Sequence, residues 1–455
     1  RIITGTNGNL SIAPGSSIMM QYDAANSKWR VIGGTGSGSS VTIATLATTS
    51  ANFIPTLMDS ENGQFGMEGM AIIYRNSLYT MGNGTANTGN KPYGMNDNGN
   101  TAYNAGSPSL MTVAATTSSP TGPTGWSNVI GTNASACALS NIGTVYCWGD
   151  NSVGQLGTGD GPTDHYIATM VSFPPAAGTI TKIFTLHSTD LNETGDSYWA
   201  IDNIGKVWGW GYNAQGVLGN GNATNQTLPV QIGSGVWSGK VITKISASTN
   251  TGGGGMAAAI DSNGALYTWG YNDHGQLGQG DTTQRSTPTL VANMSSSTVD
   301  VQVRSGYNAN NAFSQFVIAL RADGTVWGTG SNNHGQLGIG NTTSQNTFVQ
   351  ASSLSGVNIK KIFSTGAYSS TIGNYYGGDV YAVSATGQLY VVGSNGYGEL
   401  GLNDTVNRTS YVQPSGAFQG KVAKVVALNT YRDQSTGESL ILTTDGQLWG
   451  AGYNG

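Results

Sequence analysis

Apolar and polar positions alternate along this chain in a unit that returns many times. Each unit starts with an apolar stretch, turns at Gly or Asn, continues with a second apolar stretch that ends in Trp-Gly or a relative, and closes on Asn and Gly-Gln-Leu-Gly. The clearest copies span residues 259–278 and 318–338. Short runs of Val, Ile, Trp and Tyr between turn residues are typical of β-strands. Since no helical period accompanies them, the pattern predicts an all-β protein.

The glycine that ends the second apolar stretch counts these units. It recurs with spacings of 67, 62, 59, 60, 63 and 59 residues, at Gly82, Gly149, Gly211, Gly270, Gly330, Gly393 and Gly452. A fixed period of this length, built from strands, indicates the blades of a propeller. The sequence therefore predicts a seven-bladed β-propeller.

Each unit is expected to supply four strands. In one copy these are residues 241–245, 257–260, 266–269 and 288–291, from the inner strand to the outer one. The last copy ends at Gly455 before an outer strand, whereas residues 53–58 resemble the outer-strand text of residues 286–291. We expect the N-terminal strand to complete the last blade, because a closed ring leaves no sheet edge open.

The chain divides into three predicted parts. Residues 1–33 read as three short strands, a β-rich shaft or attachment segment, and residues 34–40 as a Gly/Ser linker. Residues 41–455 form the propeller. Three short strands bury too little surface to be stable alone, so this segment is expected to rely on other copies of itself.

Composition narrows the class of partner. Of 455 residues 69 are Gly and only 9% are charged, so Asn, Ser, Thr and Gly cover the surface, as in many extracellular and virion proteins. A net charge of −5 with 18 Lys and Arg gives no basic footprint, which argues against nucleic acid as a partner. No apolar run is long enough to span a bilayer, so no membrane insertion is expected.

Cys137 and Cys147 are the only cysteines. They flank the turn at Ile142 symmetrically, so they are expected to face each other across one hairpin. A disulfide is compatible with this position. Directly paired strands rarely suit disulfide geometry, however, so two small packed side chains are the favoured interpretation.

The recurring residues resemble the repeat of the regulator of chromosome condensation family. The resemblance rests on the apolar strand, the Asp-Gly turn, Trp-Gly and Asn-x-x-Gly-Gln-Leu-Gly, and covers roughly residues 50–455. It implies a seven-bladed β-propeller, in agreement with the count. The functions of the family range from nucleotide exchange on a GTPase to ubiquitin-ligase modules, enzyme inhibition and surface proteins, so the fold alone does not select one.

The N-terminal segment is similar to short segments of bacteriophage tail fibres. Residues 9–17, 21–23 and 28–34 carry this similarity. Together with the low charge content, it favours a tail fibre or receptor-binding protein located in the virion, with an extracellular or cell-surface location as the alternative. The implied partners are a host cell-surface glycan or protein and other virion tail proteins. Because fibre shafts of this kind are usually trimers, the resemblance also implies a homotrimer formed through the N-terminal segment.

Catalytic chemistry finds little support in the sequence. His274 and His334 occupy the same repeat position before Gly-Gln-Leu-Gly, which indicates a role in building blades. His165 follows Asp164 in a loop, but no Ser or Cys nucleophile motif accompanies it. We therefore predict a non-enzymatic protein without a cofactor, a metal site or catalytic residues.

The loops between the first and second strands of successive blades emerge on one face of a propeller. Here they are rich in Tyr, Asn, Ser and Gly, which combine rigid contact area with adaptable hydrogen bonds. Ordinary polar loops would have a similar composition. The predicted receptor-binding residues are Tyr307, Asn308, Asn310, Tyr368, Tyr375, Tyr376, Tyr431 and Arg432.

The leading hypothesis is a tail fibre whose propeller loops recognise a host receptor without covalent chemistry. The main alternative is a protein-protein interaction propeller, of the GTPase-regulator or enzyme-inhibitor type. A carbohydrate-cleaving enzyme and a structural virion component are further alternatives.

Overall fold

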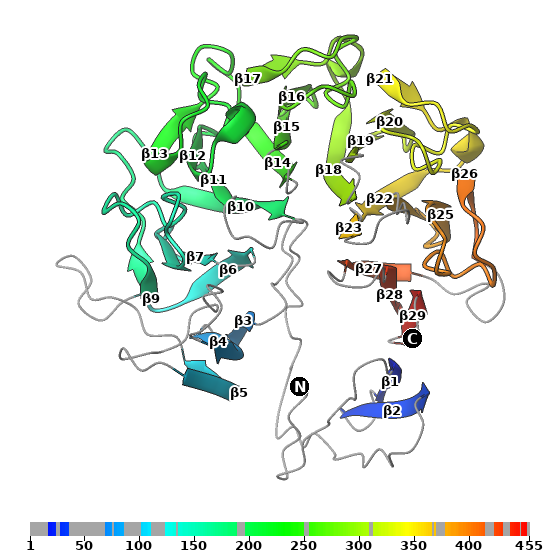
Figure 1. Cartoon of the computed structure of the whole chain (residues 1–455), viewed down its shortest axis with the longest axis horizontal. Helices are drawn as coiled ribbons and strands as arrows, with labels where there is room; N and C mark the ends of the chain where they lie inside the picture. Colours follow the sequence, from blue (N-terminus) through cyan, green and yellow to red (C-terminus); the bar gives the residue numbers. More distant parts are fainter. Residues whose placement is uncertain are drawn as a thin grey trace.

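The computed structural model shows an all-β propeller, with blades that follow one another around a ring in chain order (Figure 1). It describes residues 17–23, 28–35, 69–74, 77–85, 102–110, 123–132, 135–188, 196–249, 254–308, 313–365, 368–369, 378–414, 423–430, 437–445 and 447–452. In this part of the chain, no helix is both long and apolar enough to cross a membrane.

Seven antiparallel blades are described, numbered here in chain order. Blade 1 comprises β3 (Gly69–Tyr74), β4 (Ser77–Thr85) and β5 (Ala102–Leu110); blade 2 comprises β6 (Trp126–Gly131), β7 (Ser135–Ser140), β8 (Val145–Gly149) and β9 (His165–Met170). Blade 3 comprises β10 (Ile180–Ser188), β11 (Ser197–Asp202), β12 (Val207–Gly211) and β13 (Gln226–Ile232); blade 4 comprises β14 (Ile242–Thr249), β15 (Met256–Asp261), β16 (Leu266–Gly270) and β17 (Arg285–Leu290).

The second half of the ring repeats this arrangement. Blade 5 comprises β18 (Thr298–Asn308), β19 (Phe313–Arg321), β20 (Val326–Gly330) and β21 (Gln345–Gln350); blade 6 comprises β22 (Ile359–Ser364), β24 (Asp379–Ser384), β25 (Leu389–Gly393) and β26 (Arg408–Val412). Blade 7 comprises β27 (Ala423–Thr430), β28 (Gly437–Thr443) and β29 (Leu448–Gly452). Short 3-10 turns lie at η1 (Ala214–Gly216), η2 (Ala292–Met294) and η3 (Ser352–Leu354).

From blade 2 to blade 7 the counted glycines end the third strand, as predicted, whereas Gly82 lies within β4 of blade 1. Gly330 shows why glycine is needed there: its φ is +95°, and a Cβ atom would lie 2.4 Å from the carbonyl oxygen of Gln315 on the neighbouring strand. An L side chain would meet both an unfavourable backbone conformation and a backbone atom. The repeat count therefore reflects a constraint of the blade itself.

The N-terminal residues form a separate hairpin of β1 (Ser17–Asp23) and β2 (Lys28–Thr35), and β1 lies next to β29 of the last blade (Figure 1). The strand that we predicted at residues 53–58 to close the ring lies outside the described residues. The predicted division into shaft, linker and propeller is not tested and stays a prediction.

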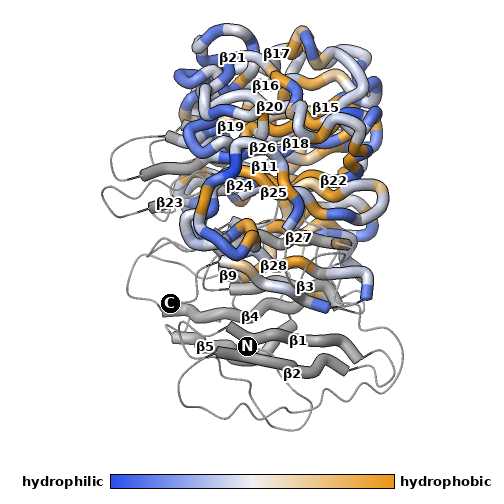
Figure 2. The backbone as a smooth tube through the Cα atoms, turned by 90° about the vertical axis from the view of Figure 1, so that its right-hand side faces the viewer, coloured by the Kyte–Doolittle hydropathy of each residue, from blue (hydrophilic) through white to orange (hydrophobic). Residues whose placement is uncertain are grey.

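The hydrophobic core lies between the blades. In the described part of the chain, each of the six pairs of consecutive blades has its own cluster of buried side chains. The apolar strand centres and the polar connections are seen in Figure 2. Apolar faces of neighbouring sheets thus pack on each other, which is the usual way for twisted sheets to exclude water.

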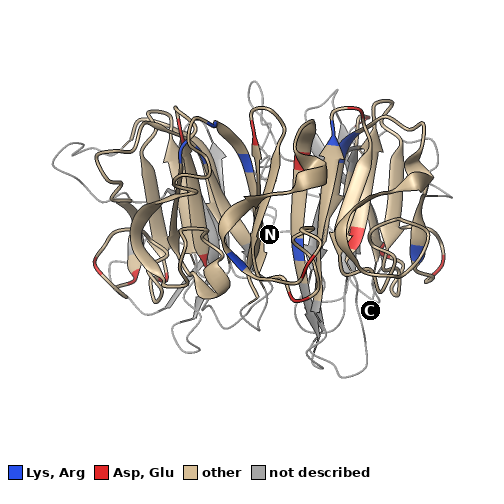
Figure 3. Ribbon diagram, turned by 90° about the horizontal axis from the view of Figure 1, so that it is seen from above, with Lys and Arg blue, Asp and Glu red and all other residues tan. Residues whose placement is uncertain are grey.

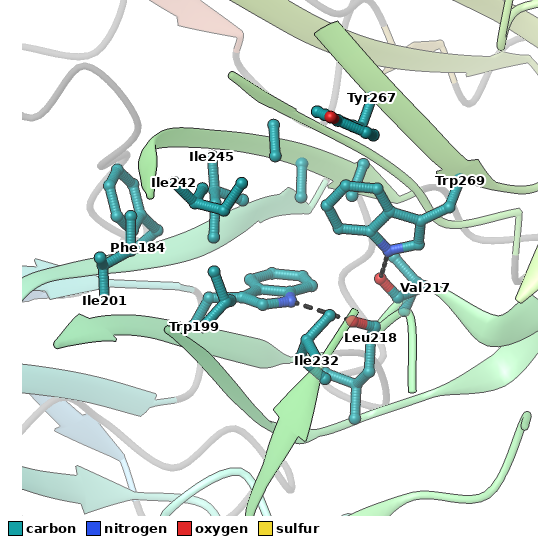
Figure 4. Packing of buried hydrophobic residues seen from close by; sticks show 14 of the residues in the cluster. Phe184, Trp199, Ile201, Val217, Leu218, Ile232, Ile242, Ile245, Tyr267 and Trp269 are labelled. Atoms are coloured by element: carbon teal, nitrogen blue, oxygen red, sulfur yellow. Dashed lines mark hydrogen bonds between the residues drawn. The ribbon is translucent and has the colours of Figure 1, made fainter. Parts of the chain in front are cut away.

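The cluster between blades 3 and 4 shows how tryptophans join this packing to the loops (Figure 4). Trp199 and Trp269 are fully buried, and each indole still finds a hydrogen-bond acceptor. Trp199 Nε1 donates to the carbonyl of Leu218 at 3.3 Å, and Trp269 Nε1 donates to that of Val217 at 2.7 Å. Both acceptors belong to the loop after β12. The loop is therefore fixed by the same side chains that fill the core.

The propeller has two faces. The ends of the first strands and the beginnings of the second strands, together with the described Gly-Gln-Leu-Gly loops, lie on what we call the inner-strand face. The hairpin turns between the second and third strands, with the connections into the next blade, lie on the opposite turn face. Figure 3 views the ring from the side and shows how few charged residues either face carries.

Candidate functional site

The recurring Asn of each unit is a scaffold residue. Asn332 is fully buried, and its Oδ1 accepts the N–H of Leu337 at 2.9 Å. Its Nδ2 donates to the carbonyls of Asn341 at 2.9 Å and Thr343 at 3.2 Å. The equivalent side chains accept the same N–H five residues onward, at Asn151, Asn213, Asn272 and Asn395. The Asn-x-x-Gly-Gln-Leu-Gly motif therefore builds loops and leaves no free polar group for a ligand.

The motif's Gln is also structural, and blade 6 replaces it. Gln276 and Gln336 each accept the N–H two residues earlier, at 2.9 and 3.0 Å. Blade 6 has Glu399 there, which keeps this bond through Tyr397 N at 2.7 Å. Glu399 is almost fully buried, and burial raises the pKa of its carboxyl. Hence the loop of blade 6 carries an acid where blades 2, 4 and 5 carry Gln155, Gln276 and Gln336, while blade 3 has Val217 at this position.

A second buried acid lies near Glu399. Asp379 accepts hydrogen bonds from Thr365 Oγ1 and, at 3.0 Å, from the Tyr381 hydroxyl. The same hydroxyl is 2.8 Å from the main-chain oxygen of Glu399, which also accepts from Ser439 Oγ at 2.9 Å. Burial, and then the charge of Glu399, raises the pKa of Asp379 to about 7. We call these groups the joint between blades 6 and 7, because Ser439 belongs to blade 7 and the other residues to blade 6. Its two acids make the joint sensitive to pH.

Sequence reasoning missed this joint. The signal that could have revealed it is Glu399 in place of Gln in the motif. Asp379 carried no such signal, because an acid at the start of a second strand looks like an exposed residue until the neighbouring blade covers it.

The inner-strand face is held together by direct contacts between the first strands. Strands β10 and β14 pair in parallel over Leu186–Ser188 and Ala247–Thr249. Between blades 4 and 5 two serine hydroxyls take this role: Ser246 and Ser248 accept the N–H groups of Val303 and Ser305, each at 3.0 Å. The ends of these strands are thus fixed relative to one another.

Blades 5 and 6 meet at the predicted binding residues. The two-residue strand β23 (Tyr368–Ser369) pairs in parallel with β18, which sets Tyr307 opposite Tyr368 and Asn308 opposite Ser369. Arg304, three residues before Tyr307, is buried and donates its Nε–H to the carbonyl of Ser364 at 2.7 Å. The backbone at Tyr307, Asn308 and Tyr368 therefore forms one locus on the inner-strand face.

The other predicted contacts lie outside the described residues: Asn310, Tyr375, Tyr376, Tyr431 and Arg432. The structure does not test whether any of the eight residues binds a ligand, and this stays a prediction.

The two cysteines are joined by a disulfide in the structure. Cys137 on β7 and Cys147 on β8 are directly opposite, in the register that the sequence predicted with Leu139 opposite Val145. The favoured interpretation, two packed thiols, is therefore not what the structure has. Its premise, that directly paired strands rarely suit disulfide geometry, does not hold for this pair, whose Cα atoms lie 4.1 Å apart.

The described histidines have local partners. His165 Nε2 lies 2.6 Å from Asp160 Oδ2, and its Nδ1 lies 2.8 Å from Thr169 Oγ1. His274 Nδ1 lies 2.5 Å from Asp273 Oδ1. Over the described ranges, no three His, Cys, Asp or Glu side chains are grouped so that they could hold a metal ion.

Comparisons with known proteins identify the type of repeat. Residues 205–251, 263–310 and 323–372 match the Regulator of chromosome condensation (RCC1) repeat, and residues 133–155 match a second description of that repeat. The matched segments lie on consecutive blades. The chain therefore carries RCC1 repeats, and the findings support the RCC1 propeller family, as the motif had indicated.

Relatives and solved structures agree with this assignment. The chain is 28% identical to human E3 ubiquitin-protein ligase HERC2 over 72% of its own length but 6% of that protein, and 29% identical to the ultraviolet-B receptor UVR8 of Arabidopsis thaliana over 47% and 43%. It thus spans less than half of these relatives. Yeast RCC1 (Prp20) bound to Kap60 superposes with a TM-score of 0.55 at 17% identity, covering 91% of this chain and 86% of the other. At this identity the likeness concerns the fold.

The predicted tail-fibre function is wrong. The relatives are RCC1-like proteins, namely a ubiquitin ligase and a photoreceptor, and the structural neighbours include the Prp20p protein of Saccharomyces cerevisiae. A host glycan, virion proteins and a homotrimer have no support in these findings. The hypothesis rested on the similarity of the N-terminal segment to bacteriophage tail fibres, which these findings do not support, and on the scarce charge, which does not specify a virion.

Two further predictions remain open. The prediction of a non-enzymatic protein is not confirmed, because one relative is named an E3 ubiquitin-protein ligase. The location of the protein, in a virion or outside the cell, stays a prediction that no comparison tests.

Proposed function

We propose that this chain is a protein-interaction propeller that binds a soluble regulatory partner, of the small-GTPase class, through its inner-strand face. The observation that carries the proposal is the pairing of β18 with β23, which fixes Tyr307, Asn308 and Tyr368 at one locus. Tyrosine is common at the energetic centres of protein interfaces, because a rigid ring buries a large area at a small entropic cost.

The scaffold supports a binding role over a catalytic one. The recurring Asn and Gln side chains are occupied by loop hydrogen bonds, so they stabilise the scaffold and are not offered to a substrate. Two structural neighbours are binding proteins: yeast RCC1 was solved bound to Kap60, and Prp20p binds Gsp1p and histones. From these neighbours we carry over the binding of another protein, and from the resemblance to the regulator of chromosome condensation family the small-GTPase class of the partner.

The test uses the purified full chain with a panel of purified small GTPases that carry a fluorescent nucleotide. We expect a one-to-one complex with one member, detected by size-exclusion chromatography with light scattering, and a change in its rate of nucleotide release. Replacing Tyr307 and Tyr368 together by Ala is expected to weaken this complex about tenfold or more.

The matched control replaces Thr386 and Asn358, two residues of the turn face, by Ala. This control should bind like the wild type. If no GTPase of the panel forms a complex, the partner does not belong to this class. If a complex forms but tolerates the loss of both tyrosines, its site does not lie at Tyr307 and Tyr368 on the inner-strand face.

A further inference from the structure

A second surface lies on the turn face, opposite the proposed binding locus. Four apolar side chains on blades 2 to 4 are exposed there: Ile142 by 63%, Ile204 by 55%, Val241 by 45% and Val236 by 40%. We call these four residues the aliphatic patch. Ile142 and Ile204 are the tips of consecutive hairpin turns, and the two valines lie in the connection from blade 3 to blade 4.

Backbone hydrogen bonds hold these tips side by side. The N–H of Asn203 donates to the carbonyl of Thr179 at 2.8 Å, and that of Ile242 to the carbonyl of Gly205 at 3.2 Å. The turn that carries Ile204 is thus tied to the start of its own inner strand and to the start of the next one. Ile204 and Val241 therefore belong to neighbouring, mutually fixed segments and present a preformed surface.

The fold does not require aliphatic residues at these positions. The equivalent turn tips of blades 4, 5 and 6 are Asn263, Asp323 and Thr386. The carbonyl of Val241 accepts the N–H of Ser262 at 2.8 Å, and the same bond in the next two blades is made by Ser297 and Asn358. Polar residues thus make the same backbone bond, in the case of Ser297 at a φ of +67°. The bond itself therefore does not require the exposed aliphatic side chains of Ile204 and Val241. Grouped exposed aliphatic side chains are typical of interaction surfaces.

Lysines accompany the patch. Lys182 is exposed on the inner strand of blade 3, and its Nζ donates to the carbonyl of Thr243, two residues after Val241. Lys240 precedes Val241 and lies over the ring of Tyr267. The Tyr267 hydroxyl, and more weakly Asp261, raises the pKa of Lys240, so it is cationic at neutral pH.

Acidic groups on this part of the turn face are buried. Asp202 accepts two backbone N–H groups of its own turn, from Ile204 and Lys206, and also the Trp208 indole. Asp261 lies 3.6 Å from Lys240 and is 2% exposed. Within the described turns and connections of blades 2 to 4, no exposed Asp or Glu surrounds the patch. The charge open to a partner is therefore positive, on a chain whose net charge is −5.

We propose that the aliphatic patch, with Lys182 and Lys240, binds an acidic segment of another protein that carries aliphatic side chains between its carboxylates. Aliphatic side chains would bury Ile204 and Val241, and carboxylates would pair with the two ammonium groups. Nucleic acid fits poorly, because the patch offers few cations and much apolar surface. The surface is separate from the inner-strand face, so the inference does not depend on the proposed function.

The test measures fluorescence anisotropy with labelled synthetic peptides and the purified full chain. One peptide alternates Leu and Glu, the second replaces Glu by Lys, and the third replaces Leu by Ser. We expect the Leu/Glu peptide to bind at least about tenfold more tightly than either of the others. Its affinity should fall with added salt, because exposed charges are screened.

The decisive variant exchanges patch residues for those of the next blade: Ile204→Asn and Val241→Ser reproduce Asn263 and Ser297. This double variant should lose about tenfold in affinity for the Leu/Glu peptide and keep its thermal unfolding midpoint. The matched control, Thr386→Asn with Asn358→Ser, alters the polar half of the same face and should bind like the wild type. Lys182→Gln with Lys240→Gln should remove most of the salt dependence.

Four results would overturn the inference. One is equal binding of the Leu/Glu and Leu/Lys peptides. Another is unchanged binding by the Ile204→Asn/Val241→Ser variant. The third is a preference for anionic lipid vesicles or single-stranded DNA over the Leu/Glu peptide. Loss of peptide binding in the Tyr307→Ala/Tyr368→Ala variant alone would assign the peptide to the inner-strand face and also reject the patch.

Discussion

The Gly-Gln-Leu-Gly loops and the hairpin turns recur with the same period on opposite faces, but they differ in what is held constant. In the loops, the Asn equivalent to Asn332 bonds the same backbone groups in blade after blade. In the turns, the backbone bonds repeat while the tip residue changes from Ile204 to Asn263 to Asp323. Constant side chains are those that the fold uses, and variable ones are free to serve a partner.

The largest effect is expected from a glycine of the repeat. Gly330→Ala places a Cβ 2.4 Å from the Gln315 carbonyl at a φ of +95°, whereas Gly356→Ala has a similar φ of +80° with no atom within 4 Å. The backbone penalty of about 1 kcal/mol is common to both. We expect Gly330→Ala to lose about 3 kcal/mol or more and Gly356→Ala about 1 kcal/mol in urea unfolding. Equal losses of stability in the two variants would show that the close approach of Gly330 to the neighbouring strand is not the reason for glycine at this position.

The next effect concerns the loop asparagine. Asn332→Ala removes the acceptor of the Leu337 N–H and both donors to the carbonyls of Asn341 and Thr343. Buried groups left without partners cost about 1–3 kcal/mol in total here. Asn358→Ala, at an exposed position, should change stability by less than about 0.5 kcal/mol. Chemical denaturation of both variants measures the difference, and a near-neutral Asn332→Ala would contradict the scaffold role.

The altered loop of blade 6 predicts a pH dependence. The pKa of Asp379 is about 7 in the folded chain, above its ordinary value of 3.8, so the folded state holds the proton more tightly. The protonated Asp379 side chain therefore contributes its full free energy to folding below about pH 4. This contribution is lost as the pH rises through about 7. Between these limits we expect a loss on the order of 1–3 kcal/mol.

Asp379→Asn keeps a polar side chain but removes this titration. Its unfolding midpoint should vary less with pH than that of the wild type, while Glu399, whose pKa is also raised, leaves a residual slope of the same sign. Asp323→Asn at an exposed turn is the control, because hydrogen bonds from Thr325 lower the pKa of Asp323. Thermal unfolding of these variants between about pH 4 and pH 7 measures this dependence. If the midpoint varies with pH equally in the wild type and in Asp379→Asn, the joint between blades 6 and 7 is not sensitive to pH.

The blades could be predicted from the sequence because their constraints are local. The expected strands at residues 241–245, 257–260, 266–269 and 288–291 correspond to β14 to β17 with boundary shifts of a few residues. Glycines such as Gly330 and asparagines such as Asn332 are fixed by contacts within one unit or with the next. A short sequence motif that repeats with a fixed period is therefore sufficient to predict the blades and their number.

Contacts between non-repeated residues could not be predicted in this way. The parallel pairing of Tyr307 with Tyr368 brings together residues far apart in sequence, and neither carries a repeat signature. The burial of Asp379 depends on the neighbouring blade. Function was harder still, since low charge and polar loops follow from the turn-rich fold and were mistaken for evidence of a virion.

The smallest effect on the free energy of unfolding is expected at the tips of the hairpin turns. It tests the comparison between these turns and the Gly-Gln-Leu-Gly loops. Ile204→Asn and the reciprocal Asn263→Ile exchange tip residues between blades 3 and 4, where both side chains are exposed and both turns keep their backbone bonds. Because neither side chain packs in the core, each change should alter the free energy of unfolding by less than about 0.5 kcal/mol. Urea unfolding of the two variants measures this. A loss above about 1 kcal/mol for Ile204→Asn would place Ile204 among the scaffold residues. A role in stabilising the fold would then explain the exposed Ile204 without a binding partner. In blade 3 the hairpin-turn tip would then serve the fold in the same way as the residues of the Gly-Gln-Leu-Gly loops.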